Sequence, residues 1–154
     1  MAVNLPELDA TQLKPVKGIQ LATVNAGIKN NGSDDLVLIE LAPNSQVAAV
    51  YTQNVFCAAP VTVAKQHQQQ AQSRYCLINS GNANAGTGQQ GLQTAIASCD
   101  SVAKQTNVKT DQVLPFSTGV IGEQLPLDKI QQVIPELVSE LSADNWFKAA
   151  KSIM

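Results

Sequence analysis

The fold that this sequence predicts is decided by residues 75–103, in which Tyr75-Cys-Leu-Ile78 precedes Asn79-Ser-Gly-Asn-Ala-Asn-Ala-Gly-Thr-Gly88 and a helical pattern. The apolar run at 75–78 predicts a buried strand that leads directly into a loop rich in Asn and Gly. From Gln90 the apolar residues recur at the spacing of one buried helical face. The members of that face are Leu92, Ala95, Ile96, Cys99, Val102 and Ala103. The order of strand, loop and helix favours a layered fold with helices packed on a sheet.

A second junction between a strand and a helical region follows. Val113-Leu-Pro-Phe116 predicts a strand, which ends in Ser117-Thr-Gly-Val-Ile-Gly122. Both junctions place small polar residues at the end of a strand, and in layered α/β proteins ligands bind at such ends. The two junctions are therefore the candidate sites.

The C-terminal part of the chain predicts helices. Pro126 and Pro135 each suit the first turn of a helix, because that turn leaves its N–H groups unpaired and proline has none. We therefore predict two short helices, at 126–134 and 135–141. A last helix is predicted over 146–154, with Ser142 or Asp144 as its cap.

The part of the chain before residue 75 predicts mainly strands. Ile19–Val24 and Asp35–Leu41 flank the turn signal Asn31-Gly32, and Val47–Thr52 predicts a further strand, so that this part resembles an antiparallel meander. The Gln-rich stretch 65–73 predicts an exposed helix without an apolar stripe. The fold class is therefore α+β, a layered mixed α/β fold with an antiparallel-rich sheet packed with helices.

Composition limits the classes of protein. The 154 residues are 44% apolar and 14% charged, which fits one globular domain over 1–154 with a leading arm at 1–15. A net charge of −2 with a single arginine gives no basic stripe, so nucleic acid is not expected as a partner. The sequence shows no signal peptide and no apolar run long enough to span a membrane, which predicts a cytoplasmic protein.

The three cysteines and the single histidine, His67, do not predict a metal site. Cys57, Cys76 and Cys99 have no Cys-x-x-Cys spacing and lie in apolar stretches, which indicates reduced thiols. His67 lies in the polar Gln stretch and is interpreted as a surface residue. Without another histidine, no Ser-His-Asp or Cys-His set can be assembled.

The pair Thr118-Gly119 is the best candidate for chemistry from the residues alone. A threonine hydroxyl beside the unhindered N–H of a glycine supplies two hydrogen-bond donors, which is what an oxyanion hole requires. A structural role is the alternative, because Ser-Thr-Gly also commonly precedes a helix and Thr118 would then be a cap. The loop at 79–88 is likewise interpreted either as a ligand loop or as a plain turn, and Asp34, Asp35 and Asp111 as turn and cap residues.

A series of short motifs, in this order and spacing, resembles one enzyme family. The motifs are Ala26-Gly-Ile-Lys29, Asp35-Leu-Val-Leu38, Val50-Tyr-Thr-Gln-Asn54, Ala58-Ala-Pro-Val61, Asn79-Ser-Gly-Asn-Ala-Asn-Ala85, Thr87-Gly-Gln-Gln-Gly91, Ser117-Thr-Gly-Val-Ile-Gly122, Leu125-Pro-Leu-Asp-Lys129 and Ala150-Lys-Ser-Ile-Met154. Together they resemble the N-terminal part of ornithine acetyltransferase, also called glutamate N-acetyltransferase, of arginine biosynthesis.

The resemblance implies a self-cleaving acyltransferase. In this family a precursor cleaves itself before a threonine, which becomes the nucleophile at the start of the second chain. That threonine takes the acetyl group from N-acetylornithine and passes it to glutamate, and some members also accept acetyl-CoA as a co-substrate. The resemblance assigns the oxyanion hole to the Thr118 hydroxyl and the Gly119 N–H. It also implies a heterotetramer of two alpha and two beta chains and no bound cofactor.

The chain departs from the family pattern at several points. Gly86 stands where many relatives have cysteine, and Cys57 stands where a basic residue is common. The sequence stops at Met154, before the expected substrate-binding segment and cleavage site, so we expect no activity without the complementary chain. Two other functions remain open: an aminopeptidase-like hydrolase of similar self-cleaving architecture, and a non-catalytic fragment that binds acyl-amino acids or a partner chain.

Overall fold

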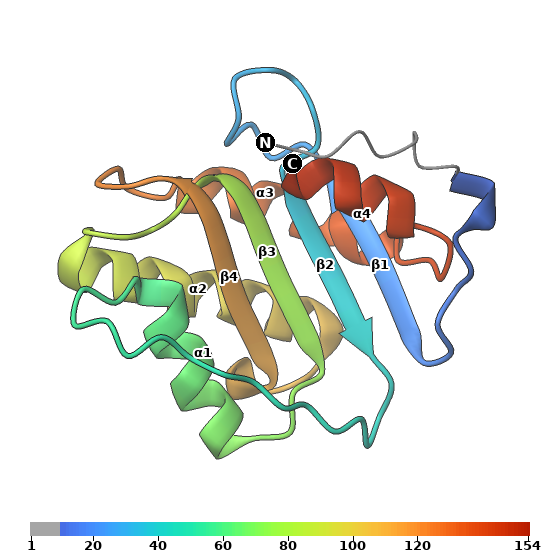
Figure 1. Ribbon diagram of the computed structural model, residues 1–154, viewed down its shortest axis with the longest axis horizontal. Coiled ribbons are helices and arrows are strands. Elements are labelled where there is room, and N and C mark those ends of the chain that lie inside the picture. The colour runs from blue at the N-terminus through green and yellow to red at the C-terminus, as the bar shows by residue number, and fades with distance from the viewer. Residues whose placement is uncertain (1–9) are drawn as a thin grey trace.

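The computed structural model describes residues 10–154 (Figure 1). Of the predicted leading arm, positions 1–9 lie outside the described residues, and η1 (Ala10–Gln12) is a single 3-10 turn. The other elements are β1 (Ile19–Val24), β2 (Leu36–Leu41), α1 (Ala59–Gln70), β3 (Tyr75–Asn82), α2 (Gly88–Thr106), η2 (Thr110–Gln112), β4 (Val113–Val120), α3 (Leu127–Ser139) and α4 (Trp146–Ile153).

The four strands form one mixed sheet in the order β1-β2-β3-β4. The β1–β2 and β2–β3 pairs are antiparallel, and the β3–β4 pair is parallel. A parallel pair needs a crossover connection, which α2 provides between β3 and β4. The predicted fold class, an antiparallel-rich sheet packed with helices, is confirmed.

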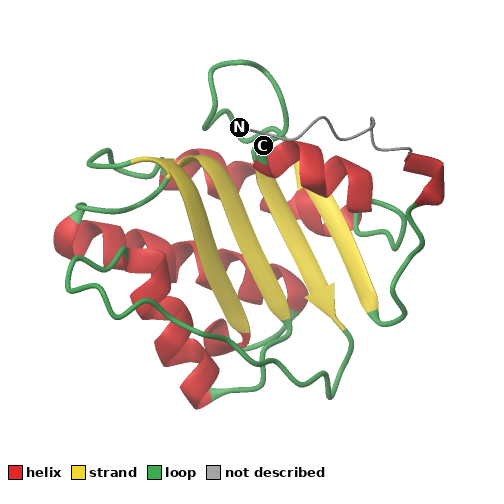
Figure 2. Ribbon diagram, viewed as in Figure 1, coloured by secondary structure: helices red, strands yellow, loops and turns green. Residues whose placement is uncertain are grey.

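Helices cover the two faces of this sheet unequally. Figure 2 shows α2 and α3 behind the sheet and α4 in front of β1 and β2. The larger core lies between the sheet and the two rear helices and includes Leu36, Leu38 and Ile134. The smaller core lies under α4 and contains Leu21 and Val37. Neighbouring residues such as Val37 and Leu38 belong to different cores because strand side chains alternate between faces.

The predicted strand at Val47–Thr52 is wrong. This segment has no strand partner among the described residues, and it crosses from β2 to α1 instead. Side chains of α1 take its polar groups: Gln68 Nε2 donates to Val47 O at 3.1 Å, and the Tyr51 hydroxyl donates to Gln68 Oε1 at 2.6 Å. The Gln-rich stretch is helical as predicted, but α1 begins earlier, at Ala59, and its glutamines are not all exposed.

The two short helices predicted around Pro135 are one helix, α3. Proline removes a backbone hydrogen bond from a helix interior. Here the helix continues because Ile130, Ile134 and Leu137 form a buried stripe on both sides of the proline. Packing therefore overrides the local preference of Pro135 for a first turn.

Two smaller predictions about the helices also differ from the structure. Ile96, placed on the buried face of α2, is 43% exposed, whereas the polar Ser98 is buried and donates to Thr94 O. At the start of α4, neither predicted residue is the cap: Asn145 stands at the N-cap and makes no side-chain cap bond.

Candidate active site

Thr118 and Gly119 lie within the last residues of β4, because the strand extends beyond Phe116, where it was predicted to end. β4 continues through Val120, and α3 begins only at Leu127, so Thr118 is not a helix cap. Their partners in the parallel ladder are Ser80 and Gly81 of β3. Because β4 is the last strand of the sheet, one of its edges is not paired with another strand, and backbone groups of such an edge are available to a ligand.

Gly119 cannot be replaced by a residue with a side chain without strain. Its φ is +132°, a region that residues with a β-carbon rarely adopt. A β-carbon there would lie 2.6 Å from the Asn82 nitrogen and would overlap the Gly81 carbonyl carbon. The close approach of β3 and β4 at this point therefore requires glycine at position 119.

The Thr118 side chain is exposed, and within residues 10–154 its hydroxyl makes no hydrogen bond. Its neighbour across the ladder behaves differently: Ser80 is buried and donates from Oγ to Ile153 O at 3.3 Å. A free hydroxyl next to a fixed glycine backbone can donate to a bound group. The arrangement can therefore supply the two donors of an oxyanion hole at one point of the surface.

The predicted ligand loop at 79–88 supports the strands from inside. Asn79 Oδ1 accepts a hydrogen bond from Ser117 Oγ at 2.6 Å, and Asn79 Nδ2 donates to Asn82 O at 2.8 Å. Asn84 is completely buried; its amide donates to Gly91 O, and it accepts from Thr87 Oγ1. These polar atoms are bonded within the protein, and residues 79–82 belong to β3, which favours the structural interpretation of the predicted 79–88 loop.

Asp35 is a supporting residue that sequence reasoning treated only as a turn residue. Its carboxylate is fully buried and accepts three backbone N–H bonds, from Ala26 at 2.7 Å, Ile28 at 2.5 Å and Lys29 at 2.8 Å. Side-chain atoms of Ile28 and Lys29 in turn pack against Gly81, the ladder partner of Gly119. The apolar residues that follow Asp35 on β2 are the only sequence signal of its burial.

An apolar cavity with a volume of about 540 Å³ adjoins Thr118. One wall is the 47–52 segment, another is the start of α1 from Ala58 to Ala64, and the floor is β4 from Leu114 to Thr118 with Cys76 beside it. Volumes of this size are typical of small-molecule sites. We call the 47–52 segment the strap, because it crosses over the sheet, and this cavity the strap cavity. The cavity would not form if the segment were a strand of the sheet.

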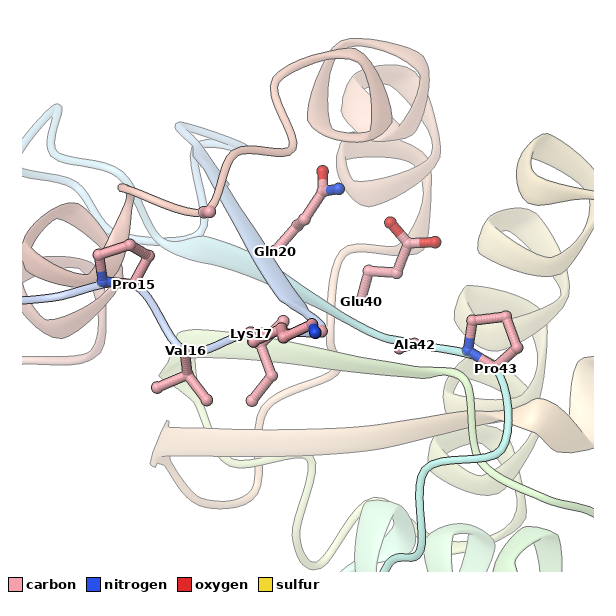
Figure 3. Close-up of a pocket in the computed structure, with 10 residues that line it drawn as sticks. Pro15, Val16, Lys17, Gln20, Glu40, Ala42 and Pro43 are labelled. Carbon is pink, nitrogen blue, oxygen red and sulfur yellow. The ribbon is translucent and has the colours of Figure 1, made fainter.

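A second cavity, of about 450 Å³, lies at the other end of the sheet (Figure 3). Glu40 and Gln20 project from β2 and β1 beside it. The Glu40 carboxylate already accepts from the Tyr75 hydroxyl at 2.9 Å and pairs with Arg74 at 3.4 Å. It is therefore a structural carboxylate, and the ladder places it at the opposite end of β3 from Ser80.

The histidine and two of the cysteines are structural. His67 is buried, contrary to the predicted surface position, because its Nδ1 lies 2.7 Å from Val113 O and ties α1 to β4. Burial raises the pKa of the Cys76 thiol to about 11 and raises that of Cys99 further. A thiol with a raised pKa is a poor nucleophile. Within residues 10–154, no cluster of three or more His, Cys, Asp or Glu side chains could hold a metal ion.

Comparison with known protein families decides which family this site belongs to. The ArgJ family model matches residues 20–154, which is most of the chain. The chain belongs to the ArgJ family. The resemblance inferred from the motifs is thereby confirmed, because the ArgJ structures include an ornithine acetyltransferase.

Curated ArgJ proteins match this chain along almost all of its length. The arginine biosynthesis bifunctional protein ArgJ of Methylococcus capsulatus is 56% identical over 147 residues, which are 96% of this chain and 36% of that protein. The ArgJ protein of Pseudomonas syringae is 50% identical over 100% of this chain and 37% of its own length. The chain thus spans little more than a third of the curated relatives that it matches.

Two solved ArgJ structures share the fold. The ornithine acetyltransferase of Mycobacterium tuberculosis, solved in complex with ornithine, superposes with a TM-score of 0.86 at 34% identity and covers 91% of this chain and 76% of that chain. ArgJ of Bacillus halodurans gives a TM-score of 0.79 at 33% identity, covering 89% and 70%. In the part of this chain that the structure describes, no helix has the length and hydrophobicity needed to cross a bilayer.

Proposed function

We propose that this chain is the N-terminal, alpha-chain part of a cytoplasmic glutamate N-acetyltransferase that moves an acetyl group from N-acetylornithine to glutamate. In this proposal Thr118 and Gly119 form the oxyanion hole. The observation that carries it is that Thr118, whose hydroxyl makes no hydrogen bond within residues 10–154, is followed by a glycine at which any side chain would overlap β3. The names of the ArgJ relatives support the reaction class.

The reaction needs a nucleophile that the complementary chain supplies. A threonine Oγ of that chain attacks the acetyl carbonyl of N-acetylornithine, and the new C–O bond places negative charge on the carbonyl oxygen. The Thr118 hydroxyl and the Gly119 N–H donate to this oxyanion. The C–N bond then breaks, and ornithine leaves with the proton that the threonine hydroxyl lost. The amine of glutamate attacks the acetyl-threonine ester and regenerates the hydroxyl. Acetyl-CoA is an alternative donor in the same scheme.

The surface around Thr118 fits a docking site for the complementary chain. Phe116, Val120 and Ile121 are 42%, 49% and 64% exposed, and Phe56, at 66%, lies with Ile121 beside Gly86. Contiguous exposed apolar side chains mark protein interfaces. We define these four residues as the apolar surface. Covering it would bring the second chain and its nucleophile next to Thr118, in a heterotetramer of two alpha and two beta chains.

The test is Thr118→Ala in the full-length enzyme. Loss of one oxyanion donor is expected to lower kcat for acetyl transfer by about a hundredfold. Thr118→Ser is the matched control, because it keeps the hydroxyl and should retain activity within a few-fold. Equal activity of Thr118→Ala and the parent enzyme would remove Thr118 from the oxyanion hole. In the parent enzyme, acetate release that does not depend on glutamate would instead identify the aminopeptidase-like hydrolase. Absence of both reactions would identify the non-catalytic fragment.

A further inference from the structure

The strap cavity lies next to Thr118, whose hydroxyl the proposed reaction uses. Thr118 and Ser117 are at one end, and the cavity continues between the strap and the floor strand to Leu114 and Cys76. An acyl carbonyl bound to the Thr118 hydroxyl would therefore have this cavity beside it. The remaining question is which part of a substrate the cavity can accept.

The strap over the cavity is held in place by α1. Tyr51 and Val47 are both bonded to Gln68, and Gln72 Nε2 donates to Ser45 O at 3.0 Å. Gln68 lies on α1 and Gln72 lies just beyond its last residue, Gln70, so the helix bonds to the strap itself and the residue after its cap bonds to the segment that leads into the strap. The cavity is consequently formed before any ligand arrives, which lowers the entropy that a ligand must lose on binding.

The lining selects for an apolar group. Toward its inner end the cavity is bounded by Pro60, Val61 and Ala64 of α1 and by Leu114. None of these side chains carries a charge or a hydrogen-bonding group. The charged amino acid part of a substrate would therefore lose its hydration there without forming a hydrogen bond or an ion pair in return. For an alkyl chain, each methylene that is buried makes the free energy of binding more favourable.

We propose that the strap cavity holds the acyl tail of the donor and that the enzyme accepts straight acyl groups longer than acetyl. This inference rests on the proposed function, because it places the acyl carbonyl at Thr118. A cavity of about 540 Å³ is far larger than an acetyl group requires. Propionyl and butyryl groups fit it, and each added methylene that is fully buried favours the longer donor by about fourfold in kcat/KM.

The experiment compares N-acetyl-, N-propionyl- and N-butyrylornithine as donors to glutamate in the full-length enzyme. The quantity measured is the ratio of kcat/KM for butyryl transfer to kcat/KM for acetyl transfer. A ratio above one is expected, because each buried methylene favours the longer donor, and a ratio below one would overturn the proposal. A parallel series of acetyl-, propionyl- and butyryl-CoA distinguishes the two donor sources of the same acyl chemistry.

Variants test whether this ratio depends on the strap cavity. Ala48→Phe adds a ring to an exposed strap residue that lines the cavity and should lower the ratio more than tenfold. Gln53→Phe adds the same ring to an exposed residue just beyond the strap and is the matched control. Val61→Ala enlarges the cavity and should raise the ratio several-fold, which gives a second readout if Ala48→Phe folds poorly.

The outcomes separate the two proposals. Equal ratios in Ala48→Phe, Gln53→Phe and the parent enzyme would show that the acyl tail lies elsewhere and would overturn the inference. Normal acetyl transfer with a ratio below one would leave the proposed function intact while removing the acyl cavity. Absence of acetyl transfer in the parent enzyme would remove the proposed function itself.

Discussion

The two sides of the Thr118-Gly119 pair differ in almost every physical respect. On the inner side is a polar support, which consists of Asp35, the 26–29 loop and the Asn-rich 79–84 segment, and its side-chain polar groups are hydrogen-bonded to one another or to backbone. On the other side is the apolar surface, whose large side chains are exposed. The polar groups of the inner side are hydrogen-bonded within this chain. The apolar side chains of the other side would be buried only by a second molecule.

This difference indicates which parts of the site each chain of the proposed enzyme supplies. Buried polar groups without partners are costly, so a network that is fully satisfied holds its members in fixed positions. In the proposed enzyme, the polar support would hold β3 against the Gly119 backbone before assembly. The Thr118 hydroxyl and the apolar surface would acquire their partners only during the proposed assembly and catalysis.

The largest expected effect comes from breaking the contact between the polar support and the site. Gly119→Ala should lower acetyl transfer by about a thousandfold, because the added β-carbon overlaps Gly81 and would displace a backbone donor of the proposed oxyanion hole. Measurement of kcat/KM in the full-length enzyme checks this. Gly122→Ala is the matched control, since it also has a positive φ but no heavy atom within 4 Å of its β-carbon. A similar loss in both variants would indicate backbone strain alone.

A smaller effect is expected from weakening the polar support at Asp35. Asp35→Asn should lower the free energy of unfolding by about 3 kcal/mol, because an amide nitrogen would face backbone N–H groups that the carboxylate now accepts. Activity should fall by about tenfold through movement of Gly81 and its neighbour Gly119.

Urea denaturation of the full-length enzyme measures the first quantity, and steady-state kinetics measure the second. Asp34→Asn is the matched control: within residues 10–154 the Asp34 carboxylate accepts one hydrogen bond, from the Thr23 hydroxyl of β1, so this variant should change the free energy of unfolding by less than about 1 kcal/mol. Unchanged stability of Asp35→Asn would show that the 26–29 loop does not depend on this carboxylate.

The sequence allowed the prediction of the sheet much better than that of the strap. β1, β2 and the start of β3 were predicted because short alternating or apolar runs fall between strong turn signals. The strap at 47–52 has the same local pattern as a strand, but its hydrogen-bond partner is Gln68, which is remote in sequence. Local periodicity carries no information about such a contact.

The candidate site shows the same limit. Thr118-Gly119 was found because the residue types themselves supply the donors. The role of Asp35 could not be predicted, because it depends on three backbone N–H groups of a loop folded back onto the carboxylate. The burial of His67 depends likewise on Val113 O of a distant strand. A residue whose role arises from tertiary contacts looks in the sequence like an ordinary turn or surface residue.

The smallest expected effect on this chain itself comes from changing the apolar surface. Ile121→Ser should change the stability of the isolated fold by less than about 0.5 kcal/mol, because the side chain is 64% exposed. In the assembled enzyme the same side chain would be buried against the complementary chain, and its loss should weaken association by about tenfold. Size-exclusion chromatography of the cleaved full-length enzyme over a dilution series measures this dissociation.

Ile96→Ser supplies the matched control for the apolar surface. Ile96 is also exposed, at 43%, but it lies on α2 behind the sheet and away from Thr118. Serine at this position should leave the association unchanged. If both variants dissociate alike, the second chain does not select the surface around Thr118. If only Ile121→Ser dissociates, the incomplete side of the site is the side at which the nucleophile arrives.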